Sequence, residues 1–315
     1  MSTAVFTPTT TEHVQLHSAK PSFIGTVRGE FFKIARQWTN WIMLVLLLGA
    51  ILLPFVVYMT APNVKTNLQA NPLHFYYNLL SITLSILRVF TGIFLLILAA
   101  RTIGLEYQLG TIRILLARGV GRLQLLFAKL LAISLIALGL LVFGLILNYL
   151  LTIVLVLGVT GNLDSFNALN SVFWSDARIY VLTILLNMGV SILLATAAAV
   201  VGRSVTFGLS AALVFFPIDN IATIMMTLAF RITHNDFWLS ATAYLLGPNL
   251  NAMASALTGG RAESIGSTPI YGVDPSGVAH GIQVDGTHTV VVALVYAAIF
   301  AVTAIVLTWK RDVKE

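Results

Sequence analysis

The sequence predicts an all-helical membrane protein that crosses the bilayer six times. Of its 315 residues, 58% are hydrophobic and only 10% are charged, whereas a soluble domain carries about 25% charged residues. The mean hydropathy is +0.92. Six apolar stretches are each long enough to cross a hydrocarbon core of about 30 Å as a helix. We therefore expect lipid, rather than water, to solvate much of the surface.

The six predicted spans lie at residues 41–59, 79–100, 130–158, 179–201, 205–230 and 289–309. Their near-continuous runs of Leu, Ile, Val and Ala lack the alternation of a barrel strand, which is about 10 residues long. A single apolar segment in lipid must satisfy its own backbone hydrogen bonds, so we expect helices. The third span is longer than the bilayer requires, and either tilts or extends beyond it.

Lys and Arg residues are unevenly divided between the two sides of the membrane. Thirteen lie in the N-terminal segment, the second and fourth connections and the C-terminal tail, and four lie on the opposite side. Positive residues concentrate in the cytoplasm, so both termini are predicted to be cytoplasmic. We attribute the excess of 18 Lys and Arg over 12 Asp and Glu to loops near anionic lipid, not to nucleic acid binding. The predicted location is a cell inner or plasma membrane, crossed several times.

The N-terminal segment has two predicted parts. Residues 1–20 are polar, lack the apolar centre of a signal peptide and are expected to form a disordered cytoplasmic tail. Residues 21–40 carry apolar residues at helical spacing opposite basic ones, which indicates an amphipathic helix in the inner membrane interface. The alternative is a cytoplasmic extension of the first span.

Two longer connections contain most of the polar sequence. The outer one, residues 231–288, has a mildly apolar piece at 241–257, interrupted by Gly247 and Pro248, and then a stretch rich in Gly, Ser, Thr and Pro. We expect an external cap with turns or short strands. The inner one, residues 101–129, carries an apolar stripe, and Gly119 and Gly121 divide it into two helical pieces. Such a pair of helices either lies on lipid or receives a partner protein.

Two charged residues fall inside predicted spans. Arg88 lies in the second span and Asp219 in the fifth. A charge in the hydrocarbon region is costly and needs a partner or a water-filled cavity. From the rise per residue of a helix, the two side chains reach overlapping depths. They either form an ion pair or line a substrate pathway. Pro217, close to Asp219 and Asn220, predicts a bend in the fifth helix, tolerable only against protein or a cavity.

The inner connection contains a familiar signature. Residues 106–122, EYQLGTIRILLARGVGR, together with Lys129, resemble the signature of the type-two (ABC-2) ABC export permeases. Glu30, Phe31 and Lys33 resemble the N-terminal Glu-x-x-Lys element of that family. Residues 244–257, with Pro248 and Asn251, are similar to its segment before the last helix. The resemblance covers nearly the whole chain and implies the type V exporter fold.

The resemblance implies that the chain is half of an exporter and not itself an enzyme. A second copy or a paralogous permease completes the pathway, and a dimer of separate ATP-binding subunits hydrolyses ATP. The chain itself lacks a G-x-x-x-x-G-K-[ST] loop, so ATP and Mg are expected on the partner and no cofactor on this chain. The residues implied in coupling to that partner are Glu106, Gly110, Thr111, Ile112, Arg113, Leu115, Leu116, Arg118, Gly119 and Arg122.

Two other functions are weighed against this one. A secondary transporter driven by an ion gradient usually has several intramembrane carboxylates, whereas this chain offers Asp219. An intramembrane protease would use Ser210, in a Gly-x-Ser-x element like that of rhomboid proteases, with a His in the last helix. The sixth span contains no His. The sequence does not name the cargo, and the direction of transport follows only from the resemblance.

Overall fold

A computed structural model describes residues 22–117, 119–262, 272–273, 279–280 and 284–310. Within them, six helices are long and apolar enough to cross a membrane. They are α2 (Trp38–Thr60), α4 (Pro72–Gln108), α6 (Arg122–Thr160), α7 (Ser171–Gly202), α8 (Val205–Thr233) and α11 (Gly286–Lys310). The prediction of an all-helical fold with six spans is confirmed. The predicted tail at residues 1–20 lies outside the described residues.

Shorter elements connect these helices. They are α1 (Phe23–Ala35), α3 (Val64–Ala70), α5 (Thr111–Ala117), the 3-10 helix η1 (Asp164–Ala168), α9 (Phe237–Thr242), α10 (Leu246–Leu257) and the strands β1 (Gly272–Val273) and β2 (Ala279–His280). The strands pair antiparallel and fall in the stretch where turns or short strands were predicted. α1 is separated from α2 by an extended residue, Gln37, so it is not a continuous extension of the first span.

Several helices extend well beyond the apolar stretches of the sequence. α4 has 37 residues and is about 55 Å long, far more than the bilayer core requires. It begins at Pro72, a position where proline is tolerated because the first helical N–H has no partner. At the other end, residues 101–108 continue α4 and residues 122–129 begin α6. Hence the predicted coupling segment of residues 101–129 is mostly membrane-helix ends, with only α5 and its two turns between them.

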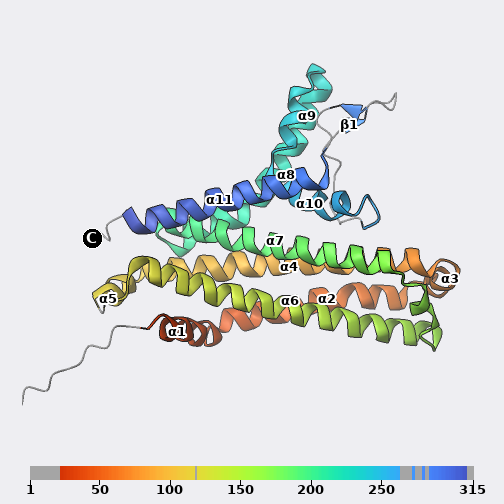
Figure 1. Cartoon of the computed structure of the whole chain (residues 1–315), viewed down its shortest axis with the longest axis horizontal. Coiled ribbons are helices and arrows are strands. Elements are labelled where there is room, and N and C mark those ends of the chain that lie inside the picture. Colours follow the sequence, from red (N-terminus) through yellow and green to blue (C-terminus); the bar gives the residue numbers. More distant parts are fainter. Residues whose placement is uncertain (1–21, 118, 263–271, 274–278, 281–283, 311–315) are drawn as a thin grey trace, which may run out of the picture.

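α4 and α7 form the centre of the bundle. In their most apolar stretches, 67% and 61% of the residues are buried, against 11% for α8. Figure 1 shows α4 lying between α6 and α7, with α2 beside α6. The core is built from fully buried aliphatic side chains of these helices, such as Leu87, Leu95, Ile133 and Ile184.

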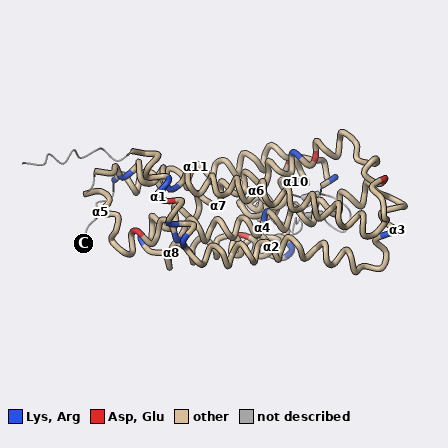
Figure 2. Tube along the Cα trace, turned by 90° about the horizontal axis from the view of Figure 1, so that it is seen from below, with Lys and Arg blue, Asp and Glu red and all other residues tan. Residues whose placement is uncertain are grey.

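The two ends of the bundle differ in composition. α1, α5 and the end of α11 lie at one end, whereas α3 lies at the other (Figure 1). Figure 2 shows Lys and Arg gathering at the end that carries α1 and α5, with more scattered charges along the rest of the bundle. This asymmetry fits the uneven distribution of basic residues along the sequence.

Only the first part of α8 packs in the bundle. Its first part packs on α7 and α4, and its last part stands away from the other helices together with α9 (Figure 1). Pro217 lies inside this helix, and a proline there removes one backbone hydrogen bond and bends the axis. The side chains beyond it are largely exposed apolar residues: Ile218, Ile221, Ile224, Met225, Leu228 and Ile232.

The turn between α7 and α8 packs tightly on the end of α4. A Cβ placed on Gly104 would lie 2.8 Å from the Cα and N of Val205, closer than atoms approach in proteins. The side-chain Oε1 of Gln108 accepts a hydrogen bond from Val205 N at 3.4 Å. Ser204 caps α8, since its Oγ accepts from Phe207 N. The connection between α7 and α8 is thus a two-residue turn fixed against α4.

Candidate functional site

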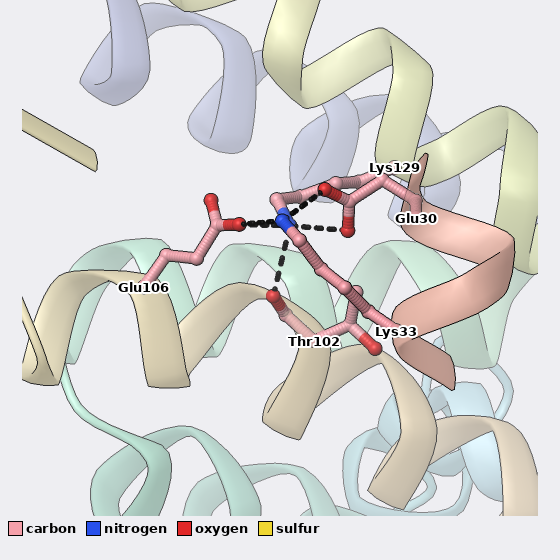
Figure 3. A network of polar contacts seen from close by, with 5 residues as sticks. All are labelled: Glu30, Lys33, Thr102, Glu106 and Lys129. Atoms are coloured by element: carbon pink, nitrogen blue, oxygen red, sulfur yellow. Dashed lines mark hydrogen bonds and ion pairs between the residues drawn. The ribbon is translucent and has the colours of Figure 1, made fainter. Parts of the chain in front are cut away.

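Four charged side chains meet where α1, α4 and α6 come together, and we call this cluster the ionic junction: Glu30, Lys33, Glu106 and Lys129. Lys129 Nζ lies 2.7 Å from Glu30 Oε2 and 2.8 Å from Glu106 Oε1. Lys33 Nζ lies 2.7 Å from Glu30 Oε1 and 2.9 Å from Glu106 Oε1. Figure 3 shows the two ammonium groups between the two carboxylates. The cluster is electrically neutral, with two positive and two negative charges.

The helix α1 brings its side of the junction into place. Ser22 caps its start, since its Oγ accepts a hydrogen bond from Gly25 N at 3.0 Å. The buried face of α1 consists of Val27, Glu30 and Ile34. The acidic Glu30 therefore lies on the same buried face as the apolar Val27 and Ile34. The placement of α1 in a membrane interface stays a prediction.

The junction is largely withdrawn from solvent. The side chains of Lys129 and Glu30 are 4% and 2% exposed. Lys129 also donates to the backbone oxygen of Thr102 at 3.2 Å, whereas Oε2 of Glu106 is buried with no hydrogen-bond partner in the described part of the chain. Breaking a buried ion pair by removing one partner typically costs about 3–5 kcal/mol. We therefore expect the junction to stabilise the packing of α1, α4 and α6 against one another.

Lys33 closes the junction on its outer side and is half exposed. Burial lowers the pKa of Lys33, but hydrogen bonds and charge interactions with Glu30 and Glu106 outweigh this and raise the pKa above its ordinary value. The ammonium form is thus stabilised by the fold.

The short helix α5 begins and ends at glycines in the left-handed backbone region. Gly110 has φ +66° and Gly119 has φ +84°, conformations that other residues seldom adopt. Both residues therefore lie in turns whose backbone conformation favours glycine. Arg118, the other residue predicted near this turn, lies outside the described residues.

Part of the predicted docking stripe on α5 is used by the chain itself. Ile112 is buried against Val120 and Leu125, with Leu115 packed on the same cluster. The apolar side chains that α5 and its preceding turn leave exposed are Ile114, 56% exposed, and Leu109, 69% exposed. The sequence periodicity predicted the amphipathic helix. It did not show that residues at the start of α6 cover part of the apolar stripe.

The other predicted coupling residues lie in α5 itself or at the start of α6. Thr111 and Leu116 are half-buried and Arg113 is exposed. Arg122, at the start of α6, donates from Nη1 to the backbone oxygen of Trp309 at 3.4 Å, which joins the coupling end of α6 to the end of α11. A cavity of about 370 Å³ lies between the junction and α5, and Leu109 and Ile114 line it together with Glu30 and Lys33.

A second polar site lies in the middle of the bundle. Arg88, the seventeenth of the 37 residues of α4, donates to the backbone oxygen of Leu250 and, at 3.0 Å, to Asn251 Oδ1. Asp219 accepts a hydrogen bond from Gly247 N. The predicted ion pair between Arg88 and Asp219 is absent from the described residues: both side chains bind α10 instead.

The reason is the position of α10. The segment predicted as an external cap packs inside the bundle, with Leu246 and Asn249 fully buried. Asn249 Nδ2 donates to the backbone oxygens of Ala243 and Leu245, both at 2.7 Å, whereas its Oδ1 is buried without a hydrogen-bond partner among the described residues. Pro248 does not interrupt the helix but lies in its first turn, where proline is accepted.

A cavity of about 400 Å³ opens beside Arg88, and we call it the central cavity. Its lining comes from α4, α7, α8 and α10 and includes Pro217, Asn220 and Asn251. Ser191 also lines it, and the Ser191 hydroxyl is buried without a partner among the described residues. Asp219 itself is not among the lining residues. The site thus combines one guanidinium, several amides and apolar walls, a combination that suits recognition of a partly polar solute.

The six-span fold, the exposed short helix at one end and the polar cavity at mid-bundle together define a membrane permease. A family model described as ABC-2 family transporter protein matches residues 26–219, and this chain belongs to that family. The match includes most of α1, the ionic junction, α5 and the first part of α8. No curated protein and no solved structure matches the chain.

Proposed function

We propose that this chain is the pathway-forming permease of an ABC exporter, driven by ATP hydrolysis on a separate subunit. The observation that carries the proposal is the position of α5. This helix and the turn before it present Ile114 and Leu109 at the charged end of the bundle, immediately beside a junction that joins three other helices. On this proposal the charged end faces the cytoplasm, in agreement with the positive-inside rule.

The ionic junction explains how force on α5 would reach the membrane. α5 follows α4 after two residues and precedes α6 by four. Glu106 belongs to α4 and Lys129 to α6, so movement of α5 displaces both sides of the junction together. Packed helices shift between discrete arrangements rather than deforming smoothly. Closure of an ATPase dimer on α5 would thus tilt α1, α4 and α6 as one body.

The central cavity is the proposed substrate contact. Arg88 and Asn251 supply polar groups, and Leu213 and Phe216 supply apolar surface. Both helix α4 and helix α8 line this cavity, so a tilt of α4 relative to α8 changes its shape. The exposed apolar side chains of α8 beyond Pro217 are the proposed surface for a second permease copy or a paralogous permease.

The test is association with the ATP-binding subunit. Co-expressed with that subunit, the Ile114→Glu and Leu109→Glu variants should lose co-purification by at least about 10-fold, since a buried unpaired charge costs more than 1.4 kcal/mol. Leu163→Glu is the matched control, because Leu163 is also exposed but lies at the opposite end of the bundle. Membrane insertion of all three should equal wild type.

Two results would overturn the proposal. One is wild-type association of the Ile114→Glu and Leu109→Glu double variant. The other is transport of solute by the purified chain, reconstituted alone in vesicles, without any nucleotide. The second result would favour a transporter driven by an ion gradient.

A further inference from the structure

A large apolar cavity lies at the end of the bundle opposite α5, and we call it the lateral cavity. Its volume is about 530 Å³, within the range of about 300–1,000 Å³ typical of small-molecule sites. α4 contributes Leu80 and Leu84, α6 contributes Leu145, α7 contributes Val181, and Phe166 of η1 also lines it. It shares no lining residue with the central cavity. It is therefore a separate site.

The lateral cavity faces outward between α6 and α7. Three of its lining side chains are strongly exposed at the surface of the bundle: Tyr149, Trp174 and Leu182. Because α4 lies between α6 and α7 in Figure 1, it forms the floor of this site. An opening toward the surface of a membrane-spanning bundle gives access to lipid. Tyr and Trp are typical of the depth where hydrocarbon meets headgroups.

Two polar groups stand in this apolar lining without partners among the described residues. Asn148 is 6% exposed, and its Oδ1 is buried and accepts no hydrogen bond, while its Nδ2 donates to Gly144 O. Arg178 lines the cavity, is exposed, and forms no ion pair with any residue that the structure describes. It is the eighth residue of α7, about 10 Å along the helix from its start.

The carboxylate nearest in sequence does not neutralise Arg178. Asp176 is held by Arg261, with Nε–Oδ2 at 2.7 Å and Nη2–Oδ1 at 3.0 Å, and by the hydroxyl of Tyr77 at 2.8 Å. A guanidinium that has no partner in the described part of the chain can bind an anionic headgroup, and the adjoining apolar cavity can take a hydrocarbon chain. A small inorganic anion would contact only the guanidinium, and a neutral hydrocarbon would contact only the apolar cavity. An anionic amphiphile would contact both.

We propose that the lateral cavity binds an anionic amphiphile of the bilayer, such as a phosphatidylglycerol. One acyl chain enters the cavity between α6 and α7, and the phosphate lies on Arg178. Asn148 Oδ1 accepts a hydrogen bond from a hydroxyl of the bound molecule. The proposal concerns this chain alone and does not depend on the proposed export function.

The test uses Trp174 as a reporter inside the site. The other four tryptophans, Trp38, Trp41, Trp238 and Trp309, are replaced by Phe in the full chain, which is placed in nanodiscs. Phosphatidylglycerol or phosphatidylcholine with brominated acyl chains is then added in increasing fraction. Bromine quenches tryptophan only at close range. We expect half-maximal quenching at about 10-fold lower phosphatidylglycerol than phosphatidylcholine, since a charge-assisted bond supplies the difference.

Variants separate the parts of the site. Arg178→Gln should abolish the preference for phosphatidylglycerol and leave quenching by both lipids equal. Arg231→Gln is the matched control, because Arg231 is another exposed Arg, at the end of α8. It should retain the full preference. Ala177→Phe, which fills the cavity with a phenyl ring, should reduce quenching by both lipids.

Other outcomes would overturn the proposal. Equal quenching by both lipids in the reporter protein would show that no anion is recognised. Loss of the preference on adding millimolar inorganic phosphate would show a site for the free ion rather than a lipid. Absence of quenching, together with cross-linking between copies at Tyr149, would show that a second copy of the chain covers the cavity.

Discussion

Glu30 and Lys129 form a buried ion pair across 99 residues of sequence, with Oε2 and Nζ 2.7 Å apart. The pair joins the first helix of the chain to the start of α6. Glu106 completes it from α4, so three helices that follow different paths through the bundle are fixed at one point.

The first prediction concerns the energy of this pair. Lys129→Met leaves two carboxylates with only Lys33 to compensate them, and we expect the free energy of unfolding to fall by about 3–5 kcal/mol. Unfolding in mixed micelles, followed by circular dichroism, measures the change. Lys65→Met is the control, because Lys65 is exposed on α3 and should change stability by less than about 0.5 kcal/mol. Equal stability of the two variants would contradict a structural role for the junction.

The second prediction concerns alkaline pH. The pKa of Lys33 is raised in the folded protein above its ordinary value of 10.5. Its stabilising contribution is therefore complete below pH 10.5 and is lost as the pH rises through the folded-state pKa. Lys33→Arg, whose side chain stays charged, should lose less stability than wild type over this alkaline range. The measurement is the unfolding temperature against pH. Parallel curves for the two proteins would exclude the linkage.

The third prediction distinguishes the observed partner of Arg88 from an independent site. Arg88 and Asn251 share a hydrogen bond of 3.0 Å, so the effects of Arg88→Ala and Asn251→Ala should be non-additive by about 0.5–3 kcal/mol. Asn148 is another buried amide but shares no partner with Arg88. Arg88→Ala and Asn148→Ala should therefore add within about 0.5 kcal/mol. A double-mutant cycle on unfolding free energy gives both values, and additive losses for the first pair would show that the contact contributes nothing.

The fourth prediction compares two glycines within helices. A Cβ at Gly104 would lie 2.8 Å from backbone atoms of Val205, whereas one at Gly139 would meet nothing within 4 Å. Gly104→Ala should thus destabilise the protein by about 1–3 kcal/mol through overpacking. Gly139→Ala should stabilise it by up to about 1 kcal/mol, because alanine favours the helix. If Gly104→Ala proved as stable as Gly139→Ala, α4 and the turn before α8 would not be in contact.

Hydropathy was sufficient to predict the six helices, because crossing the bilayer as a helix requires about 20 consecutive, mainly apolar residues. It failed at their ends. A hydropathy scale assigns polar residues such as Arg101 and Glu106 to a loop, yet α4 continues through them beyond its apolar stretch. How far a helix continues beyond the hydrocarbon core depends on the residues that contact its ends, and those residues come from distant parts of the sequence.

The candidate site was only partly predictable for the same reason. The resemblance placed Glu30, Lys33, Glu106 and Lys129 among the characteristic residues, but nothing in their spacing shows that they meet. For Arg88, the depth argument located Asp219 at a suitable height and missed α10, which lies against both side chains. Burial of this moderately polar segment is helped by local hydrogen bonds, because Asn249 Nδ2 donates to backbone oxygens of the same segment.

The absence of a side chain at Gly104 has a mechanical consequence. There the backbone of α4 rests directly on the first residue of α8, with no flexible group between them to absorb displacement. If α4 rocks as proposed above, this contact would transmit the movement to α8. Displacement in a rotation grows with distance from the axis, so the residues of α8 beyond Pro217 would then move the furthest.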